Sequence, residues 1–441
     1  MLLIYTPNIT SRIEYIFKYV FEERLGAAYQ LTNNKEAFIT NKNDLKIAYA
    51  DEYIDSALNF YAVSLLFEED IKEIDLYEAE CNNTKVLFTH NQSAALNFDV
   101  FAAVFYLLSR YEEYLNKPLI EHGNYDYKNS VLYKLNILDI PVVEQWLELL
   151  KEVLLKNFPS LKFKKHTPRF GLSIDVDVAF AYKARGFIRT AGGVVKKMIQ
   201  LNFSDAKDQL LTILNIKKDM YDTYDYIFSF AKNKKSIFFF DMGDYGEFDK
   251  NPSWKNKIFQ RLIKYISSKA LVGLHPSYAS NADKKLVTAE KKKLEIITKQ
   301  KITASRQHYL KLKMPDTFNN LIVNGITEDY TLGYYYTYGF RAGTCNSFLF
   351  FDLKKNAATS LRLYPYAYMD GTLNDILKIS INDAKAAVSK LINTTYKYDG
   401  IFIPLWHNST LYNRNEWKGW REVFEHTIEE IEAKSFENLF D

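Results

Sequence analysis

The sequence predicts an α/β protein: residues 166–441 form a parallel β/α barrel, and residues 1–165 form a separate α/β accessory domain. Three observations support this division. A chain of 441 residues is long for one domain. In the second part, short apolar runs recur roughly every 30 to 37 residues, the length of a strand plus a crossover helix. The stretch 159–170, with two prolines and a basic cluster, is typical of a boundary between domains.

Composition excludes several classes of function. Hydrophobic residues make up 47% of the chain and charged residues 25%, which is ordinary for a globular protein. The 57 basic and 54 acidic residues leave a net charge of only +3, so no nucleic-acid partner is expected. No signal peptide is evident, and no apolar run reaches the roughly 18 residues of a transmembrane segment. With only Cys81 and Cys345, no disulfide framework is expected, and we predict a cytoplasmic protein.

The first part of the chain mixes short apolar strands with amphipathic helices. Residues 98–115 and 142–158 carry apolar side chains at helical spacing. No glycine-rich phosphate loop follows a predicted strand there, so nucleotide binding has no support. The role of this part stays open.

The second part is built from seven strand-like runs with helical patterns between most of them. The helices are predicted at 253–270, 284–299 and 381–393. Each run ends on polar or ionisable residues, and functional groups of parallel barrels gather at the carboxyl ends of the strands. The polar ends, which we expect to converge on one mouth, carry Asp175, Asp177, Asp241, His275, His308, Arg341, Asp370 and His407.

The run "GLSIDVDVAF" places Asp175 and Asp177 two residues apart in an apolar strand, so both carboxylates point to the same face. Two neighbouring carboxylates repel each other unless one is protonated or a cation lies between them. Carboxylate and imidazole ligands with an open position suit catalytic Zn²⁺. A single histidine usually just packs, but three at equivalent strand ends beside two aspartates indicate a divalent-metal site.

The order of these motifs resembles the polysaccharide deacetylases, the NodB-homology group of carbohydrate esterases. The motifs are Asp-x-Asp, "HPS", an arginine run, an aspartate run and "LWH", within residues 168–435. The resemblance implies an irregular (β/α)7 barrel. The branch of this superfamily that carries an N-terminal domain of unknown function fits the whole chain best. The expected cofactor is a divalent metal ion, for which the ligand types favour Zn²⁺, with Co²⁺, Mn²⁺ or Ni²⁺ as alternatives.

The resemblance also implies roles for individual residues. Asp175 looks like the general base and Asp177 like a metal ligand. His407 looks like the general acid, Arg341 would orient the base, and Asp370 would tune the acid or its neighbours. The first metal-binding histidine would be His275. Residues expected to contact substrate are Leu405, which would line the pocket for the acetyl methyl group, Trp406 and Tyr278.

Two positions depart from the family pattern. The two acidic residues are usually adjacent, whereas Val176 separates them here. The family's second histidine lies four residues after the first, where this chain has Ala279. We expect His308, at the end of the next strand-like run, to supply the missing ligand; the alternative is an outer-shell or substrate-contact role.

The sequence therefore predicts a metal-dependent hydrolase that removes acetyl groups, N-acetyl rather than O-acetyl, from a carbohydrate. A cytoplasmic location favours a precursor of a surface polysaccharide as substrate. Two alternatives stay open: a glycan-binding pseudoenzyme without activity, or another metal-dependent hydrolase of amides or esters on the same barrel. The sequence does not indicate an oligomeric state.

Overall fold

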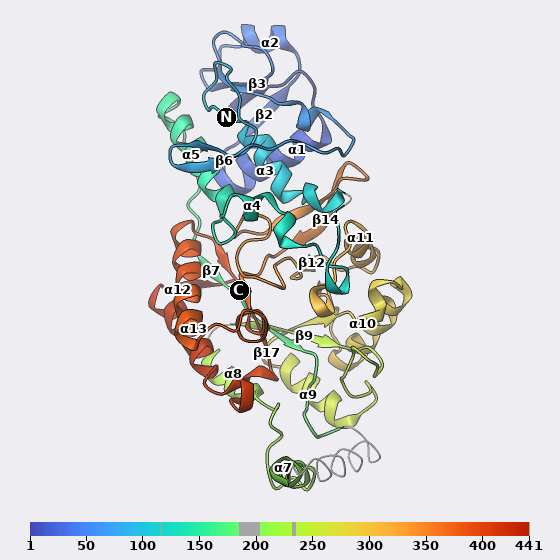
Figure 1. The fold of residues 1–441 in the computed structure, drawn as a ribbon. Coiled ribbons are helices and arrows are strands. Elements are labelled where there is room, and N and C mark those ends of the chain that lie inside the picture. Colours follow the sequence, from blue (N-terminus) through green and yellow to red (C-terminus); the bar gives the residue numbers. More distant parts are fainter. Residues whose placement is uncertain (116, 185–202, 232–234, 441) are drawn as a thin grey trace.

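The computed structural model describes residues 1–115, 117–184, 203–231 and 235–440. A small sheet lies at one end of the molecule and a large sheet with flanking helices makes up the rest (Figure 1). The chain is thus α/β, as predicted. None of the helices among the described residues is both long and apolar enough to span a membrane.

The small sheet has four parallel strands in the order β2-β1-β3-β4. Its strands are β1 (Leu2–Tyr5), β2 (Tyr29–Thr32), β3 (Lys46–Ala50) and β4 (Leu58–Tyr61), and a separate hairpin is formed by β5 (Ala79–Cys81) and β6 (Thr84–Val86). The helices of this region are α1 (Ser11–Phe17), α2 (Lys35–Thr40), α3 (Val100–Leu108), α4 (Val131–Lys134) and α5 (Val142–Asn157).

Helix α3 connects the two parts of the molecule through one apolar core. Asp99 caps the helix by accepting a hydrogen bond from the amide of Ala102 at 2.9 Å, and all nine helical residues are buried. The ring of Phe101 lies 4.6 Å from Phe17 of α1, and the ring of Phe105 lies 5.1 Å from Phe351 of the large sheet. The two parts therefore share one contiguous core.

The large sheet has nine strands in the order β13-β14-β12-β11-β10-β9-β8-β17-β15. They are β8 (Leu172–Val176), β9 (Ser236–Asp241), β10 (Leu271–His275), β11 (Ala304–Ser305), β12 (Glu328–Asp329), β13 (Phe348–Asp352), β14 (Ala357–Leu363), β15 (Tyr368–Met369) and β17 (Pro404–His407). Every pair is parallel except β13 with β14. Strands β7 (Arg169–Phe170), β16 (Ile401–Phe402) and β18 (Glu437–Asn438) form a small additional sheet.

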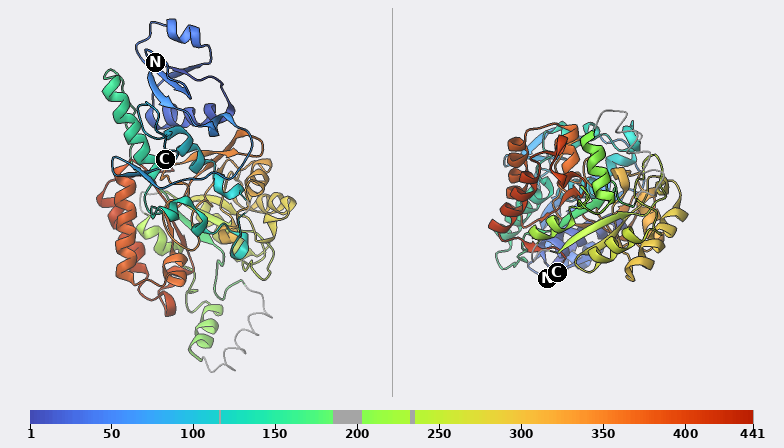
Figure 2. Two further views of the ribbon diagram at one scale, coloured as in Figure 1. Left: turned by 45° about the horizontal axis from the view of Figure 1, so that its top comes forward. Right: turned by 90° about the horizontal axis from the view of Figure 1, so that it is seen from below.

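Helices flank the large sheet on two sides. Figure 1 shows α12 (Ile381–Lys397) and α13 (Arg421–Ala433) in red on one side, and α9 (Lys257–Ser267) and α10 (Lys284–Thr298) in yellow on the other. Figure 2 shows the same arrangement from two further directions. The remaining helices are α7 (Phe203–Ile213), α8 (Tyr224–Phe230) and α11 (Asp316–Val323). The predicted helices at 253–270, 284–299 and 381–393 correspond to α9, α10 and α12.

Strand pairing gives an open order with β13 and β15 at its ends, so the irregular (β/α)7 barrel stays a prediction. The register nevertheless aligns the carboxyl ends as expected, with His407 opposite Asp175 and His275 opposite Asp241. Adjacent strand ends thus present these side chains at one edge.

The strand predicted at Arg341 is wrong, because residues 330–347 contain no strand. The run "YTYGFRAGT" contains Gly339 and Gly343, which adopt φ values of +122° and +63°. Only glycine takes such conformations readily, and they turn the backbone out of an extended path. The position between β11 and β14 in the sheet is occupied by strand β12, which was not predicted from the sequence.

Candidate metal centre

The carboxyl ends of β8, β10 and β17 and the turn after β11 enclose a cavity of about 330 Å³. Asp177, just beyond β8, lines this cavity and is 25% exposed at the side chain. His275 ends β10, His308 follows β11, and His407 ends β17. Parallel strands explain why side chains more than a hundred residues apart meet here.

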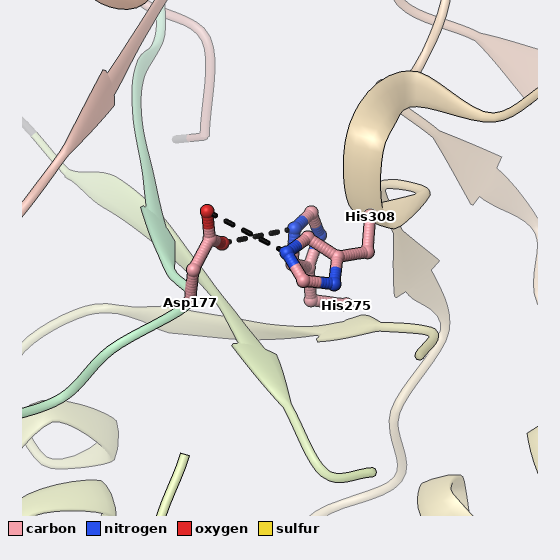
Figure 3. A group of neighbouring side chains, drawn as sticks. All are labelled: Asp177, His275 and His308. Atoms are coloured by element: carbon pink, nitrogen blue, oxygen red, sulfur yellow. Dashed lines mark ion pairs between the residues drawn. The ribbon is translucent and has the colours of Figure 1, made fainter. Parts of the chain in front are cut away.

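The imidazoles of three histidines converge on the carboxylate of Asp177. The Nε2 atom of His275 lies 3.1 Å from Oδ1, and the Nε2 atoms of His308 and His407 lie 3.7 and 3.5 Å from Oδ2. Figure 3 shows Asp177, His275 and His308 pointing toward one another. One donor atom from each of these three residues can be chosen so that all lie within 4.8 Å of each other.

The second ring nitrogen of each histidine is held by an acceptor. His275 Nδ1 lies 2.5 Å from the carbonyl oxygen of Arg306, and His308 Nδ1 lies 2.9 Å from Oδ1 of Asp249. Carbonyl and carboxylate oxygens only accept hydrogen bonds, so each Nδ1 carries a proton. When His275 and His308 are neutral, their Nε2 atoms present lone pairs toward Asp177, which is the arrangement of metal-binding histidines supported by hydrogen-bond partners at Nδ1.

The donor set fits a divalent ion. Within the described part of the chain, Oδ1 of Asp177 is buried and accepts no hydrogen bond, although His275 Nε2 is close. A lone pair facing a carboxylate oxygen is repulsive unless a cation lies between them. Tetrahedral zinc with bonds of about 2.0–2.1 Å would separate neighbouring ligand atoms by about 3.3 Å. His275 Nε2 lies 3.1 Å from Oδ1 of Asp177 and His308 Nε2 lies 3.7 Å from Oδ2, so each nitrogen is near this separation from one of the two carboxylate oxygens.

The carboxylates around His308 favour positive charge within the cluster. Burial lowers the pKa of His308, but the carboxylates of Asp177 and Asp249 outweigh it and hold the pKa well above its usual value. Burial raises the pKa of Asp177, yet His308 and His407 together bring it well below the ordinary range. A metal ion would supply the charge that protons otherwise provide.

Asp175 is bound by a buried arginine. The side chain of Asp175 is 2% exposed, and its Oδ1 accepts a hydrogen bond from Nη1 of Arg306 at 2.9 Å. Arg306 is completely buried and also donates to the hydroxyl of Ser173 and the carbonyl of Tyr330. Oδ2 of Asp175 lies 3.9 Å from His275 Nε2, so this oxygen faces the metal cluster.

The prediction that Arg341 orients Asp175 is therefore corrected. Arg341 forms a bidentate ion pair with Glu113 of the N-terminal region, at 2.9 and 2.7 Å, and donates to the carbonyl of Gly333. Arg341 lies in a glycine-turned loop rather than at a strand end, whereas Arg306 directly follows β11. Arg306 lies two residues before His308, and this spacing is the one signal in the sequence that could have identified it.

His407 is fixed by Asp370 from two directions. Its Nδ1 lies 2.7 Å from Oδ1 of Asp370, and its backbone amide donates to Oδ2 at 2.8 Å. The hydroxyl of Thr410 donates to the same Oδ2 at 2.6 Å. Burial lowers the pKa of His407, but Asp370 and Asp177 outweigh it and raise the pKa to about 10. The contact expected between Asp370 and the histidine is thus present.

The three residues expected to contact substrate differ in position. Leu405 lines the cavity. Trp406 does not: it is completely buried, packs against Phe424 and donates from Nε1 to the hydroxyl of Tyr368. Successive strand residues face opposite sides, so Leu405 and His407 share the cavity face and Trp406 points into the core. This part of the prediction is corrected.

Tyr278 lies behind the cavity wall, stacked on Phe248 with ring centroids 4.0 Å apart. The aromatic residues that do line the cavity are Phe248, Tyr309, Tyr335 and Trp417. None of these four residues was predicted from the sequence as a site residue.

Asp241, Asp249 and His308 form a second cluster of metal-binding residue types. Burial raises the pKa of Asp241 to about 8, so this carboxyl group is protonated near neutral pH and is a poor ligand. Asp249 already accepts the Nδ1 proton of His308 and the amide of Tyr278. We therefore interpret Asp241 and Asp249 as residues that surround His308 and do not bind the ion held by Asp177, His275 and His308. Residues 181–193, a basic stretch with glycines that follows Asp175 and Asp177 in the sequence, lie largely outside the described residues.

Comparisons with known proteins give limited information. Residues 2–159 match a family of unknown function (DUF7033). A search of curated protein sequences finds no match.

Among solved structures, a candidate polysaccharide deacetylase from Mycobacterium smegmatis is similar at 12% identity, with 62% of this chain and 93% of that chain covered and a TM-score of 0.36. A CE4-family pseudoenzyme from Bacillus anthracis (11%, 62% and 64%, TM-score 0.31) and a polysaccharide deacetylase from Bacillus cereus (11%, 62% and 90%, TM-score 0.29) are also similar. Similarities of this size do not establish a function, which has to be inferred from the site.

Proposed function

We propose that the protein is a metal-dependent hydrolase that removes acetyl groups, chiefly N-acetyl groups, from a carbohydrate. The observation that carries the proposal is the convergence of imidazole Nε2 atoms on Asp177, with every Nδ1 occupied by an acceptor. The order of the motifs in the sequence supports the choice of acetyl transfer to water over other metal-assisted hydrolyses.

Asp177, His275 and His308 would hold the ion, for which this mixed nitrogen and oxygen set favours Zn²⁺ over Co²⁺, Mn²⁺ or Ni²⁺. When bound, such an ion polarises an acyl oxygen and lowers the pKa of water. An irregular (β/α)7 barrel around this centre belongs to the same proposal.

Asp175 is suited to act as the general base. Arg306 holds one carboxylate oxygen and leaves the other facing the cluster, 3.9 Å from His275 Nε2. A general base needs a free acceptor oxygen within reach of the proton that it takes. The rigid attachment to a buried arginine also fixes the direction from which a proton of the attacking water is taken.

His407 is suited to act as the general acid. Asp370 raises its affinity for a proton and fixes the ring, while Nε2 faces the cavity. A histidine so placed can deliver a proton from Nε2 to the departing amine nitrogen. Leu405 and the aromatic side chains of the cavity wall would receive the acetyl methyl group and an adjacent sugar ring.

The proposal is tested by acetate release from N-acetylated amino sugars and oligosaccharides with the zinc-loaded protein. Asp175→Asn should abolish release while zinc is retained at one equivalent. Asp244→Asn, which changes a carboxylate that is 92% exposed and paired with Lys293, should leave release unchanged. Retained zinc without acetate release by the wild type would instead support a glycan-binding pseudoenzyme. Release from amides or esters that carry no sugar would indicate another hydrolase.

A further inference from the structure

The metal ligand His308 begins a turn with an unfavourable backbone. Tyr309 and Leu310, the next two residues, have φ values of +56° and +51°. Left-handed conformations are costly for residues with a side chain, and two in succession are uncommon. Such geometry persists only where the surroundings hold it in place, and it is concentrated at functional sites. The position of the His308 ring therefore depends on what holds this turn.

One of the groups that hold the turn comes from the N-terminal region. The side-chain amide of Asn124 donates to the carbonyl oxygen of Tyr309 at 3.1 Å, and Asn124 is only 3% exposed. The ring of His122 lies 4.5 Å from the ring of Tyr309, which in turn lies 4.6 Å from the ring of His308. Local backbone bonds at the turn are those from the Leu310 amide to Gln307 at 2.9 Å and from the Lys311 amide to His308 at 3.3 Å. The His308 amide itself reaches only Pro276, in the loop after β10, at 3.4 Å.

The same short segment contacts two other loops next to the cavity. His122 Nδ1 lies 3.3 Å from the hydroxyl of Tyr278. Glu121 accepts a hydrogen bond from the hydroxyl of Tyr336 at 2.9 Å, next to the cavity residue Tyr335. Residues 121–124 thus connect three loops that surround the cavity. The apolar core formed through α3 already joins the two parts of the molecule, so this segment is not needed for that purpose.

We propose that residues 121–124 of the N-terminal region position the metal ligand His308 by holding the turn 308–310 in its left-handed conformation. Asn124 is the principal positioning residue, and His122 supports it through the ring of Tyr309. The inference rests on the proposed metal site and assigns a role to the part of the chain that matches the family of unknown function. Without the bond from Asn124, the turn relaxes and Nε2 of His308 moves away from Asp177.

The test measures metal binding in the full-length protein, independently of activity. Zinc affinity is determined by competition with a chelator, and the visible absorption of the Co²⁺-loaded protein reports the geometry of the ligands. Asn124→Ala should weaken zinc binding roughly tenfold, the lower end of what loss of an outer-shell partner costs, and should change the Co²⁺ spectrum. His122→Ala should act in the same direction, and it carries the test if Asn124→Ala does not fold.

The matched control is Asn59→Ala. Asn59 is also a buried asparagine of the N-terminal region, and its amide donates to the carbonyls of Ile54 and Ala57 at 2.9 Å, within the same region. This variant should lower stability without altering zinc affinity or the Co²⁺ spectrum. If both Asn124→Ala and His122→Ala keep the zinc affinity and the Co²⁺ spectrum of the wild type, the inference is overturned and the proposed function is not affected. Failure of the wild type to bind zinc or cobalt would overturn the proposed function and the inference together.

Discussion

The ion pair between Arg306 and Asp175 leads to the sharpest prediction about energetics. Arg306→Met removes a guanidinium that is completely buried and leaves the carboxylate of Asp175, 2% exposed, without its charged partner. An uncompensated buried charge is among the costliest single changes in a protein, at about 3–5 kcal/mol. We therefore expect Arg306→Met to lower the free energy of unfolding by about 4 kcal/mol.

A double-mutant cycle separates the charge from the packing. Asp175→Asn removes the charge and keeps the shape, so Arg306→Met combined with Asp175→Asn should recover about 2 kcal/mol of the loss, a coupling typical of groups in direct contact. Urea unfolding followed by circular dichroism gives the four free energies. Arg362→Met is the control, because Arg362 and Glu23 form an ion pair that is 30% and 25% exposed. It should cost about 1 kcal/mol or less.

The reasoning is refuted if Arg306→Met costs no more than Arg362→Met, or if the two changes at Arg306 and Asp175 are additive. Additivity would mean that the carboxylate does not depend on Arg306, and the assignment of this arginine as the group that orients the base would fail.

Further predictions concern the acid, the strand faces and pH. Asp370→Asn should lower kcat for acetate release about 100-fold or more through loss of His407 as an acid, with zinc content unchanged. Trp406→Phe should lower the free energy of unfolding by about 1–2 kcal/mol without changing KM, whereas Leu405→Ala should raise KM. Burial raises the pKa of Asp329 to about 6, so the folded state binds this proton more tightly than the unfolded state. The contribution of Asp329 to stability is complete below about pH 4 and is lost as pH rises through 6. Urea unfolding of the wild type should show this loss as a fall of about 3 kcal/mol in the free energy of unfolding as the pH rises from below 4 to 7. Asp329→Asn should not show this fall.

The strands that carry the site could be predicted because each is an apolar run that ends on a polar residue. This holds for β8, β9, β10 and β17, and the carboxyl ends of parallel strands necessarily meet. The pairing of His308 with His275 followed from the same rule, although Ala279 occupies the position at which the family pattern has a histidine. Helix α10 was predicted within one residue of its observed end.

Other features depend on contacts that no local pattern contains. The loop around Arg341 alternates aromatic and small residues like a strand, and only the backbone conformations of Gly339 and Gly343 reveal that it turns. Asn124 and Tyr309 lie 185 residues apart, and their hydrogen bond exists only in the folded chain. The error at Trp406 was avoidable, because the two-residue period of a strand already places it on the face opposite His407.

The most direct test of the account is a crystal structure of the zinc-loaded protein with anomalous diffraction recorded at the zinc edge. We predict one ion, bound by a carboxylate oxygen of Asp177 and by the Nε2 atoms of His275 and His308. The absence of an ion at this position, or an ion whose ligands do not include His308, would contradict the central claim.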